Sequence, residues 1–264
     1  MPEVTRLGAS KFIRFGLYGI SGVGKTRFVG SGENVLIIRP PTEHTDSIRK
    51  PNERNVREVI VRNWDDMNDV YEHLASDGAS YDWVWLDSAS AFQDTGLDDL
   101  WEQVKEKNPH RKENGLDKRE YGINMHRFSV WLREVIALET FHFGFTAHPF
   151  EAPAPGDDDD LIWMPYIQGK GMAQKFCGYM NVVGHFQIKK IKAAGDTKAV
   201  DHRVISFGAT EEFYAKDQFD AFKNHRLIDP DMPKFLKAVE AARSRNAAAT
   251  PKTKKKTTKK TKGK

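Results

Sequence analysis

One run of eight residues near the start of the chain has the residue types and spacing that bind phosphate groups. It satisfies the pattern G-x-x-x-x-G-K-[ST] at every fixed position and reads Gly19, Ile20, Ser21, Gly22, Val23, Gly24, Lys25, Thr26. Glycines permit a loop whose backbone N–H groups point inward, and a following helix adds partial positive charge. We predict that Lys25 reaches the β- and γ-phosphates of a nucleoside triphosphate and that the Thr26 hydroxyl binds Mg²⁺.

A carboxylate farther along the chain supplies the second half of such a site. Asp87 follows the apolar run at 83–86, and a run that is apolar on both faces is typical of a central parallel strand. An acid at the end of such a strand can hold the shell of a Mg²⁺ ion, usually through water. The sequence therefore predicts ATP and Mg²⁺ as the cofactors.

Hydrolysis of a triphosphate also needs an oriented water, and hence a carboxylate near the γ-phosphate. Glu43 lies just past the apolar segment at 34–39, where a parallel sheet presents its ligand-binding edge. We predict that Glu43 is the general base; the alternative is a surface glutamate in a turn.

These residues need a sheet to position them, and the hydrophobic pattern predicts one. Strand-like segments alternate with helix-like spacing at 67–75 and 128–138. The alternation predicts an α/β fold with a mainly parallel sheet flanked by helices. The predicted strands are 12–18, 34–39, 58–62, 83–86 and 141–147.

The C-terminal half has a different pattern. Residues 182–191 and 203–207 resemble an antiparallel strand pair joined through Ala194 and Gly195, and a short helix is expected at 233–242. Two stretches rich in charge, proline or glycine, 105–120 and 149–171, are predicted to be exposed loops.

Charge divides the chain unevenly. The 264 residues carry a net charge of +4, yet 251–264 alone contain eight lysines and no acid, so the remainder carries −4. We predict one ATPase domain at 1–245 and a disordered lysine-rich tail at 246–264. The counterion of the tail is either nucleic-acid phosphate or simply solvent, in which case the tail is a solubilising end.

Composition also indicates a compartment. No apolar run approaches the roughly 20 residues that span a bilayer, and the N-terminus lacks the apolar core of a signal peptide. The single cysteine, Cys177, cannot form an internal disulfide. We therefore expect a cytoplasmic protein without a membrane partner.

Several strings resemble the RecA-core ATPases. WVWLDSASAF, in which serine follows Asp87, resembles the RecA-core metal-site signature, and VLIIRPPTEHTDSI resembles the family's strand and catalytic loop. The resemblance implies that Glu43 polarises water, with His44 beside it. FGFTAH resembles the strand that senses the γ-phosphate, so Thr146 and His148 are its candidates, although the family more often has Gln or Asn where this chain has His148.

The segment YAKD at 214–217 resembles a box found in small bacteriophage RecA-core ATPases, which are similar to phage single-strand annealing and recombination proteins. This resemblance implies a RecA-like P-loop fold, and a ring or filament of identical subunits in the host cytoplasm. It also implies that Lys216 reaches the neighbouring subunit's nucleotide; the alternative is an exposed loop lysine.

RecA-type proteins contact DNA through loops that correspond here to 105–122 and 149–175. The first contains Tyr121 for stacking and a set of basic residues, whereas the second begins with four aspartates at 157–160 that repel phosphate. The basic set is Lys105, Lys107, His110, Arg111, Lys112, Lys118 and Arg119.

Three function classes remain at this stage. The first is a DNA-stimulated ATPase acting on single-stranded DNA in phage recombination, annealing or replication. The second is an ATP-dependent adaptor that loads a phage or host replication protein. The third is a P-loop nucleotide kinase, for which the acidic segment near 157–160 would be a poor lid.

Overall fold

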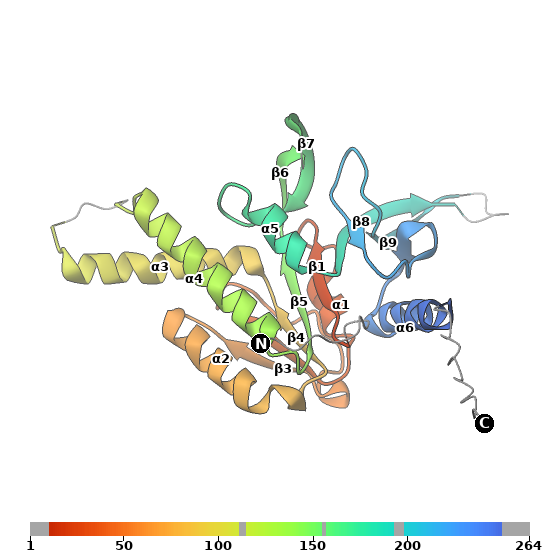
Figure 1. The fold of residues 1–264 in the computed structure, drawn as a ribbon, viewed down its shortest axis with the longest axis horizontal. Coiled ribbons are helices and arrows are strands. Elements are labelled where there is room, and N and C mark those ends of the chain that lie inside the picture. The colour runs from red at the N-terminus through yellow and green to blue at the C-terminus, as the bar shows by residue number, and fades with distance from the viewer. Residues whose placement is uncertain (1–10, 111–114, 155–156, 193–197, 250–264) are drawn as a thin grey trace, which may run out of the picture.

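The computed structural model describes residues 11–110, 115–154, 157–192 and 198–249. In this part of the chain a central sheet is covered by helices on both faces (Figure 1). Its strands lie in the order β11-β9-β8-β1-β5-β4-β2-β3. Their bounds are β1 Arg14–Tyr18, β2 Val35–Arg39, β3 Arg57–Ile60, β4 Trp83–Leu86, β5 His142–Ala147, β8 Val182–Ile191, β9 Val200–Ser206 and β11 Arg226–Ile228.

The sheet has a parallel half and an antiparallel half. Every pairing from β3 through β2, β4, β5 and β1 to β8 is parallel, whereas β8–β9 and β9–β11 are antiparallel. A short strand, β10 (Lys216–Asp217), also pairs with β8. The predicted parallel sheet and C-terminal antiparallel pair are thus confirmed, while the predicted connection at Ala194 and Gly195 lies outside the described residues.

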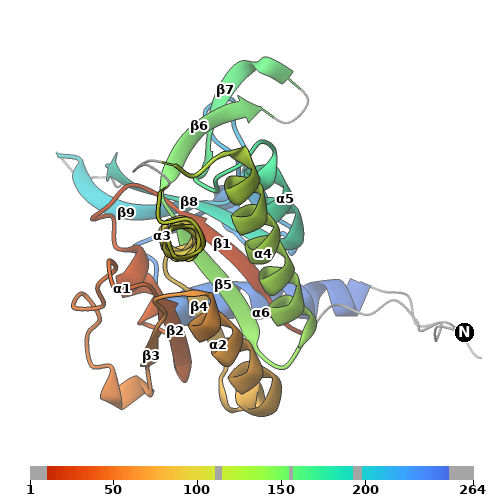
Figure 2. The ribbon, with the colours of Figure 1, turned by 90° about the vertical axis from the view of Figure 1, so that its left-hand side faces the viewer.

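Side chains alternate between two hydrophobic cores along the buried strands. In β2, Val35 and Ile37 enter one core while Leu36 and Ile38 enter the other. The first core is closed by α1 (Lys25–Val29) and α6 (Met232–Ala249). The second is closed by α2 (Trp64–Asp77), α3 (Ala89–Lys107), α4 (Lys118–Ala137) and α5 (Met172–Tyr179). Figure 2 shows α2, α3 and α4 together on one face with α6 behind the sheet.

The prediction of a long loop over 149–171 is wrong. β6 (Pro149–Ala154) and β7 (Asp157–Pro165) form an antiparallel hairpin that projects from the body of the molecule (Figure 1). Phe150 and Ala152 pair with Met164 and Ile162, so one face of the ribbon carries apolar side chains. Prolines are tolerated because a two-stranded ribbon has only edge strands.

The predicted loop at 105–120 is shorter than expected. α3 continues to Lys107, where basic side chains near a helix C-terminus are favourable. α4 begins at Lys118 behind a capping box formed by Asp117 and Glu120. Residues 111–114 of the connection lie outside the described residues.

The C-terminal helix is longer than predicted. α6 extends to Ala249, past the expected domain boundary at 245, and 250–264 lie outside the described residues. The lysine-rich tail therefore stays a prediction. The remaining elements are the short 3₁₀ turns η1 Asn52–Arg54, η2 Gly78–Ser80 and η3 Lys223–His225. Among the described helices, none has the length and apolar character needed to cross a membrane.

Candidate nucleotide-binding site

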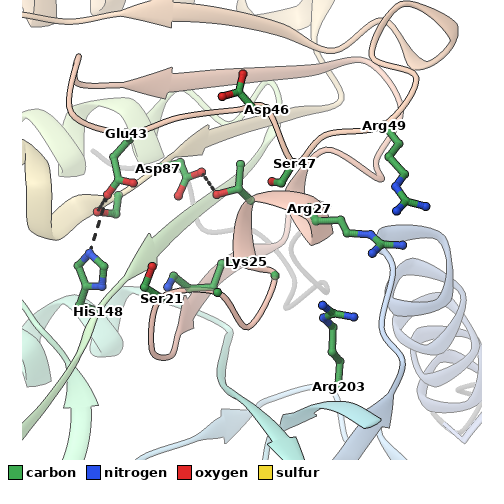
Figure 3. Close-up of a pocket in the computed structure, with 14 residues that line it drawn as sticks. Ser21, Lys25, Arg27, Glu43, Asp46, Ser47, Arg49, Asp87, His148 and Arg203 are labelled. Carbon is green, nitrogen blue, oxygen red and sulfur yellow. Dashed lines mark hydrogen bonds and ion pairs between the residues drawn. The ribbon is translucent and has the colours of Figure 1, made fainter. Parts of the chain in front are cut away.

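The residues predicted from separate motifs meet at the carboxyl ends of four parallel strands. The phosphate loop follows β1, Glu43 follows β2, Asp87 follows β4 and His148 follows β5. They line a pocket of about 480 Å³ (Figure 3). Its lining residues are Ser21, Gly22, Gly24, Lys25, Thr26, Arg27, Glu43, Asp46, Ser47, Arg49, Asp87, Ser88, His148 and Arg203.

Two glycines of the loop have structural reasons to be glycine. Gly24 has φ of 105°, a conformation that side chains disfavour, and it directly precedes α1. A Cβ on Gly19 would collide with the carbonyl oxygen of Phe186, so β8 could not approach the loop so closely. The loop therefore keeps the tight shape that exposes backbone N–H groups to an anion.

Lys25 lies over this loop and is only 9% exposed. Its Nζ donates to the carbonyl oxygens of Gly19 and Ile20, at 2.7 Å and 3.2 Å. Burial lowers the pKa of Lys25, and the carboxylates of Asp87 and Glu43 oppose that shift. The ammonium is thus held beside the phosphate loop, as the motif predicts.

The Asp87 carboxylate accepts hydrogen bonds from two hydroxyl groups. Thr26 Oγ1 donates to Asp87 Oδ2 at 2.7 Å, and Thr146 Oγ1 donates to Asp87 Oδ1. The structure therefore brings the two predicted Mg²⁺ ligands, Thr26 and Asp87, into direct contact. From the neighbouring strand, Thr146 orients the Asp87 carboxylate, and its role as a γ-phosphate sensor stays a prediction.

Glu43 is held by a residue that our motif analysis did not assign a role. Ser88 Oγ donates to Glu43 Oε1 at 2.7 Å, and His148 Nε2 lies 3.9 Å from the same oxygen. Arg39 Nη1 fixes the loop by donating to the Glu43 carbonyl at 2.8 Å. The sequence signal for Ser88 was its place directly after Asp87. His44 is exposed and does not line the pocket.

These donors fit a Mg²⁺–nucleotide complex. The Thr26 hydroxyl and the Asp87 carboxylate are hard oxygen ligands, and Mg²⁺ in such sites takes few protein ligands beside phosphate oxygens and water. Within the described residues, no cluster of three or more His, Cys, Asp or Glu side chains could hold a metal ion. The pocket suits an ion that arrives with the nucleotide.

Lys216 lies elsewhere in the structure. Its Nζ donates to the carbonyl oxygen of Met180 at 2.7 Å, at the C-terminal end of α5, and it does not line the pocket. Its action on a neighbouring subunit stays a prediction.

Arg27, Arg49 and Arg203 do line the pocket, and sequence reasoning missed all three. Arg203 is 180 positions from Val23, whose carbonyl it contacts, so no local motif could reveal it.

Comparison with known proteins gives a match, to a family of domains, over the region that contains this site. The family model described as "AAA domain" matches residues 11–219, a span that holds every residue of the predicted site. No curated protein matches the chain. With its phosphate loop, its Thr26–Asp87 pair and this match over most of its length, the chain belongs to the AAA domain family of P-loop ATPases.

Proposed function

We propose that this protein is a RecA-like ATPase that acts on single-stranded DNA in recombination, annealing or replication. The observation that carries the ATPase is the assembly, around one pocket, of the phosphate loop, the Thr26–Asp87 pair and the Ser88–Glu43 pair. Each is one of the parts that phosphoryl transfer to water needs.

The residues divide the chemistry between them. The loop N–H groups and Lys25 would bind the phosphates, and Thr26 and Asp87 would hold Mg²⁺, which would supply positive charge against the phosphates when bound. Ser88 occupies Oε1 of Glu43, which leaves Oε2 to orient a water and accept its proton. The water oxygen bonds to the γ-phosphorus as the bond to the β–γ bridging oxygen breaks, which gives ADP and phosphate.

A second pocket supports single-stranded DNA as the partner. It measures about 670 Å³ and lies where α4, the base of the β6–β7 hairpin and the start of α5 meet. Tyr121 and Phe150 on its rim are 46% and 50% exposed, and the Phe150 ring lies 5.4 Å from that of Tyr166. Lys170 adds a positive charge. Exposed aromatic rings beside a cation suit stacked bases and their phosphates.

Both sequence segments expected to contact DNA contribute to this second pocket, which we call the aromatic pocket. Tyr121 comes from 105–122, and Phe150, Tyr166 and Lys170 come from 149–175. The aspartates expected to repel phosphate lie along β7, and the side chains of 157–159 fall outside those described.

Hydrogen bonds join the hairpin to the nucleotide site. The hydroxyl of Tyr18, the residue before the phosphate loop, donates to the carbonyls of Trp163 and Tyr214 at 3.0 Å and 2.6 Å. Ser90 Oγ donates to the Tyr166 carbonyl and accepts from the His148 N–H. These contacts support stimulation of hydrolysis by DNA. A DNA strand bound at the hairpin could shift Tyr18, which precedes the phosphate loop, and His148, which lines the pocket.

The RecA resemblance carries the rest of the proposal. Identical subunits assemble into a ring or filament in which Lys216 acts on a neighbour's nucleotide. The assembly works in the cytoplasm, with phage or host replication and recombination proteins as partners.

Phosphate release from ATP and Mg²⁺, measured with and without single-stranded DNA, tests this proposal. We expect turnover that rises when DNA is added and disappears in Lys25→Ala. An exposed lysine of α6 that does not line the pocket, Lys237→Ala, serves as the matched control. Hydrolysis without any DNA binding would favour the adaptor class, and phosphate transfer to a nucleoside monophosphate would favour the kinase class.

A further inference from the structure

Three arginines from separate segments gather at one end of the nucleotide pocket. Arg27 lies in α1, Arg49 follows β2 and Arg203 belongs to β9. Figure 3 shows their guanidinium groups on one side of the phosphate loop, with Glu43 and His148 on the other. No ion pair in the described part of the chain includes any of the three. Like charges without a carboxylate partner repel one another, and an anion bound between them would offset that repulsion.

Arg203 is the most firmly placed of the three. Its Nε donates to the carbonyl oxygen of Val23 at 3.0 Å, which ties the side chain to the phosphate loop of its own chain. A Cβ on Gly24 would lie 3.2 Å from that nitrogen, so the arginine packs closely against the bare glycine. One nitrogen of the guanidinium is thereby used, and the two terminal NH₂ groups remain for a ligand.

The backbone around Arg203 is fixed as well. Its N–H donates to Asp229 Oδ1 at 3.2 Å, and the Asp229 N–H donates back to the Arg203 carbonyl at 2.7 Å. The second carboxylate oxygen of Asp229 lies 2.7 Å from His202 Nδ1. The arginine is therefore held in place by β9 and by the residue after β11, without help from another subunit.

We propose that Arg203 binds the phosphates of the nucleotide held by its own chain, at the end of the phosphate chain nearer the ribose. The inference rests on the proposed binding of ATP. The terminal phosphate belongs beside Glu43, so an arginine on the other side of the loop contacts the phosphates that ADP and ATP share. A planar guanidinium can bind two phosphate oxygens at once, which lysine cannot.

The test compares the binding of fluorescent mant-ATP and mant-ADP to the wild type and to Arg203→Met. Methionine keeps an unbranched apolar stem against Gly24 and removes the donors. Hydrogen bonds to charged groups have a strength that corresponds to a loss of roughly 10- to 150-fold in affinity. We expect a loss in this range, equal for the two nucleotides, and a smaller one in Arg203→Lys. Arg226→Ala, on the neighbouring strand β11 and away from the pocket, should bind as the wild type does.

Each other result overturns a part of the proposal. Wild-type affinity in Arg203→Met, with a melting temperature showing that it is folded, removes Arg203 from the nucleotide. A loss confined to mant-ATP would move its contact to the γ-phosphate. A wild type that binds neither nucleotide would overturn the proposed function itself.

Mixing Arg203→Met with Lys25→Ala subunits tests whether the contact lies within one chain. Lys25→Ala has no working phosphate loop but an intact Arg203. We expect no recovery of ATPase activity in the mixture, since each nucleotide needs the arginine of its own chain. Recovery would show that Arg203 acts across a subunit boundary and would overturn this point.

Discussion

Asp87 is 3% exposed, and its carboxylate accepts hydrogen bonds from Thr26 and Thr146. Burial raises the pKa of this carboxyl, and the two hydroxyl groups oppose the shift without cancelling it. A folded-state pKa above the unfolded value means that folding favours the protonated acid. Ionised Asp87 therefore lowers the stability of the nucleotide-free protein at neutral pH, although the same charge is what Mg²⁺ needs.

We predict that Asp87→Asn abolishes nucleotide hydrolysis and yet raises the melting temperature of the nucleotide-free protein at pH 7. The amide is neutral, so the cost of burying a charge disappears; each 1 kcal/mol gained corresponds to about 2–4 °C for a chain of this size. The difference should narrow as the pH falls through the folded-state pKa toward the ordinary range of an aspartate, because wild-type Asp87 then becomes protonated. Melting curves from pH 7 to pH 4 measure both effects, and a lower melting temperature for the variant at pH 7 would contradict the argument.

In the proposed mechanism, the hydrolytic step depends on Glu43. Glu43→Gln should still bind ATP but turn it over about 10²–10⁴-fold more slowly, since an amide cannot accept the water's proton. Ser88→Ala should lower turnover by a smaller factor, because the carboxylate survives but loses the 2.7 Å bond that orients it. Single-turnover assays beside mant-ATP binding separate chemistry from affinity, and Glu72→Gln, an exposed acid of α2 that does not line the pocket, is the control. Unchanged turnover in Glu43→Gln would assign the base to another carboxylate.

At the scale of elements, the sequence predicted what burial dictates locally. The strands at the centre of the sheet are apolar runs whose alternating side chains fill two cores, so hydrophobicity alone locates them. The phosphate loop and Asp87 were predictable because each follows such a run. The β6–β7 hairpin was not, because its strands form a separate two-stranded sheet, and its prolines and aspartates are also the residues of loops.

Contacts between residues that lie far apart in the sequence could not be predicted either. Ser88 holds Glu43 across 45 positions, and Arg203 reaches Val23 from the far half of the sheet. Residues so far apart in the sequence leave no periodic pattern from which their contact could be predicted. Thr146 was identified by its motif, yet its partner is Asp87 on the adjacent strand, which only the strand order reveals.

The aromatic pocket between α4 and the β6–β7 hairpin leads to a further prediction. Replacing Tyr121 and Phe150 together by alanine should weaken binding of single-stranded DNA by roughly 5- to 150-fold, as expected for the loss of base stacking. Basal ATPase activity should persist, since neither side chain lines the nucleotide pocket. Leu161→Ala removes another exposed apolar side chain, which belongs to β7 but lies outside the aromatic pocket, and should change little. Anisotropy titrations with labelled DNA decide the matter, and equal affinity in the double variant would place the DNA elsewhere.

At the scale of the whole molecule, the proposed DNA binding is divided between the lysine-rich tail and the folded body. The eight lysines at 251–264 can contribute a counterion-release term that ignores base identity, whereas the mildly acidic remainder must supply any preference for single strands. Deleting 251–264 should therefore weaken binding to single- and double-stranded DNA alike and flatten its dependence on salt. The preference for single strands and the ATPase turnover should remain. Binding isotherms at several salt concentrations test this, and a loss of the single-strand preference itself would show that the tail, rather than the body, reads the DNA.

The last helix, α6, packs against the first strand, so the core that they share can be completed only after α6 has been synthesised. The Phe235 ring in α6 stacks on Phe15 in β1 at 4.6 Å, and the Met232 N–H donates to Ser31 Oγ just after α1. At about 5–20 residues per second, a ribosome needs roughly 10–40 s to travel from Phe15 to Phe235. During that time the face of β1, β2 and β4 that enters the first core lacks the part of its cover that α6 supplies. Chains released before α6 is synthesised are therefore expected to be substrates for proteases rather than smaller working ATPases.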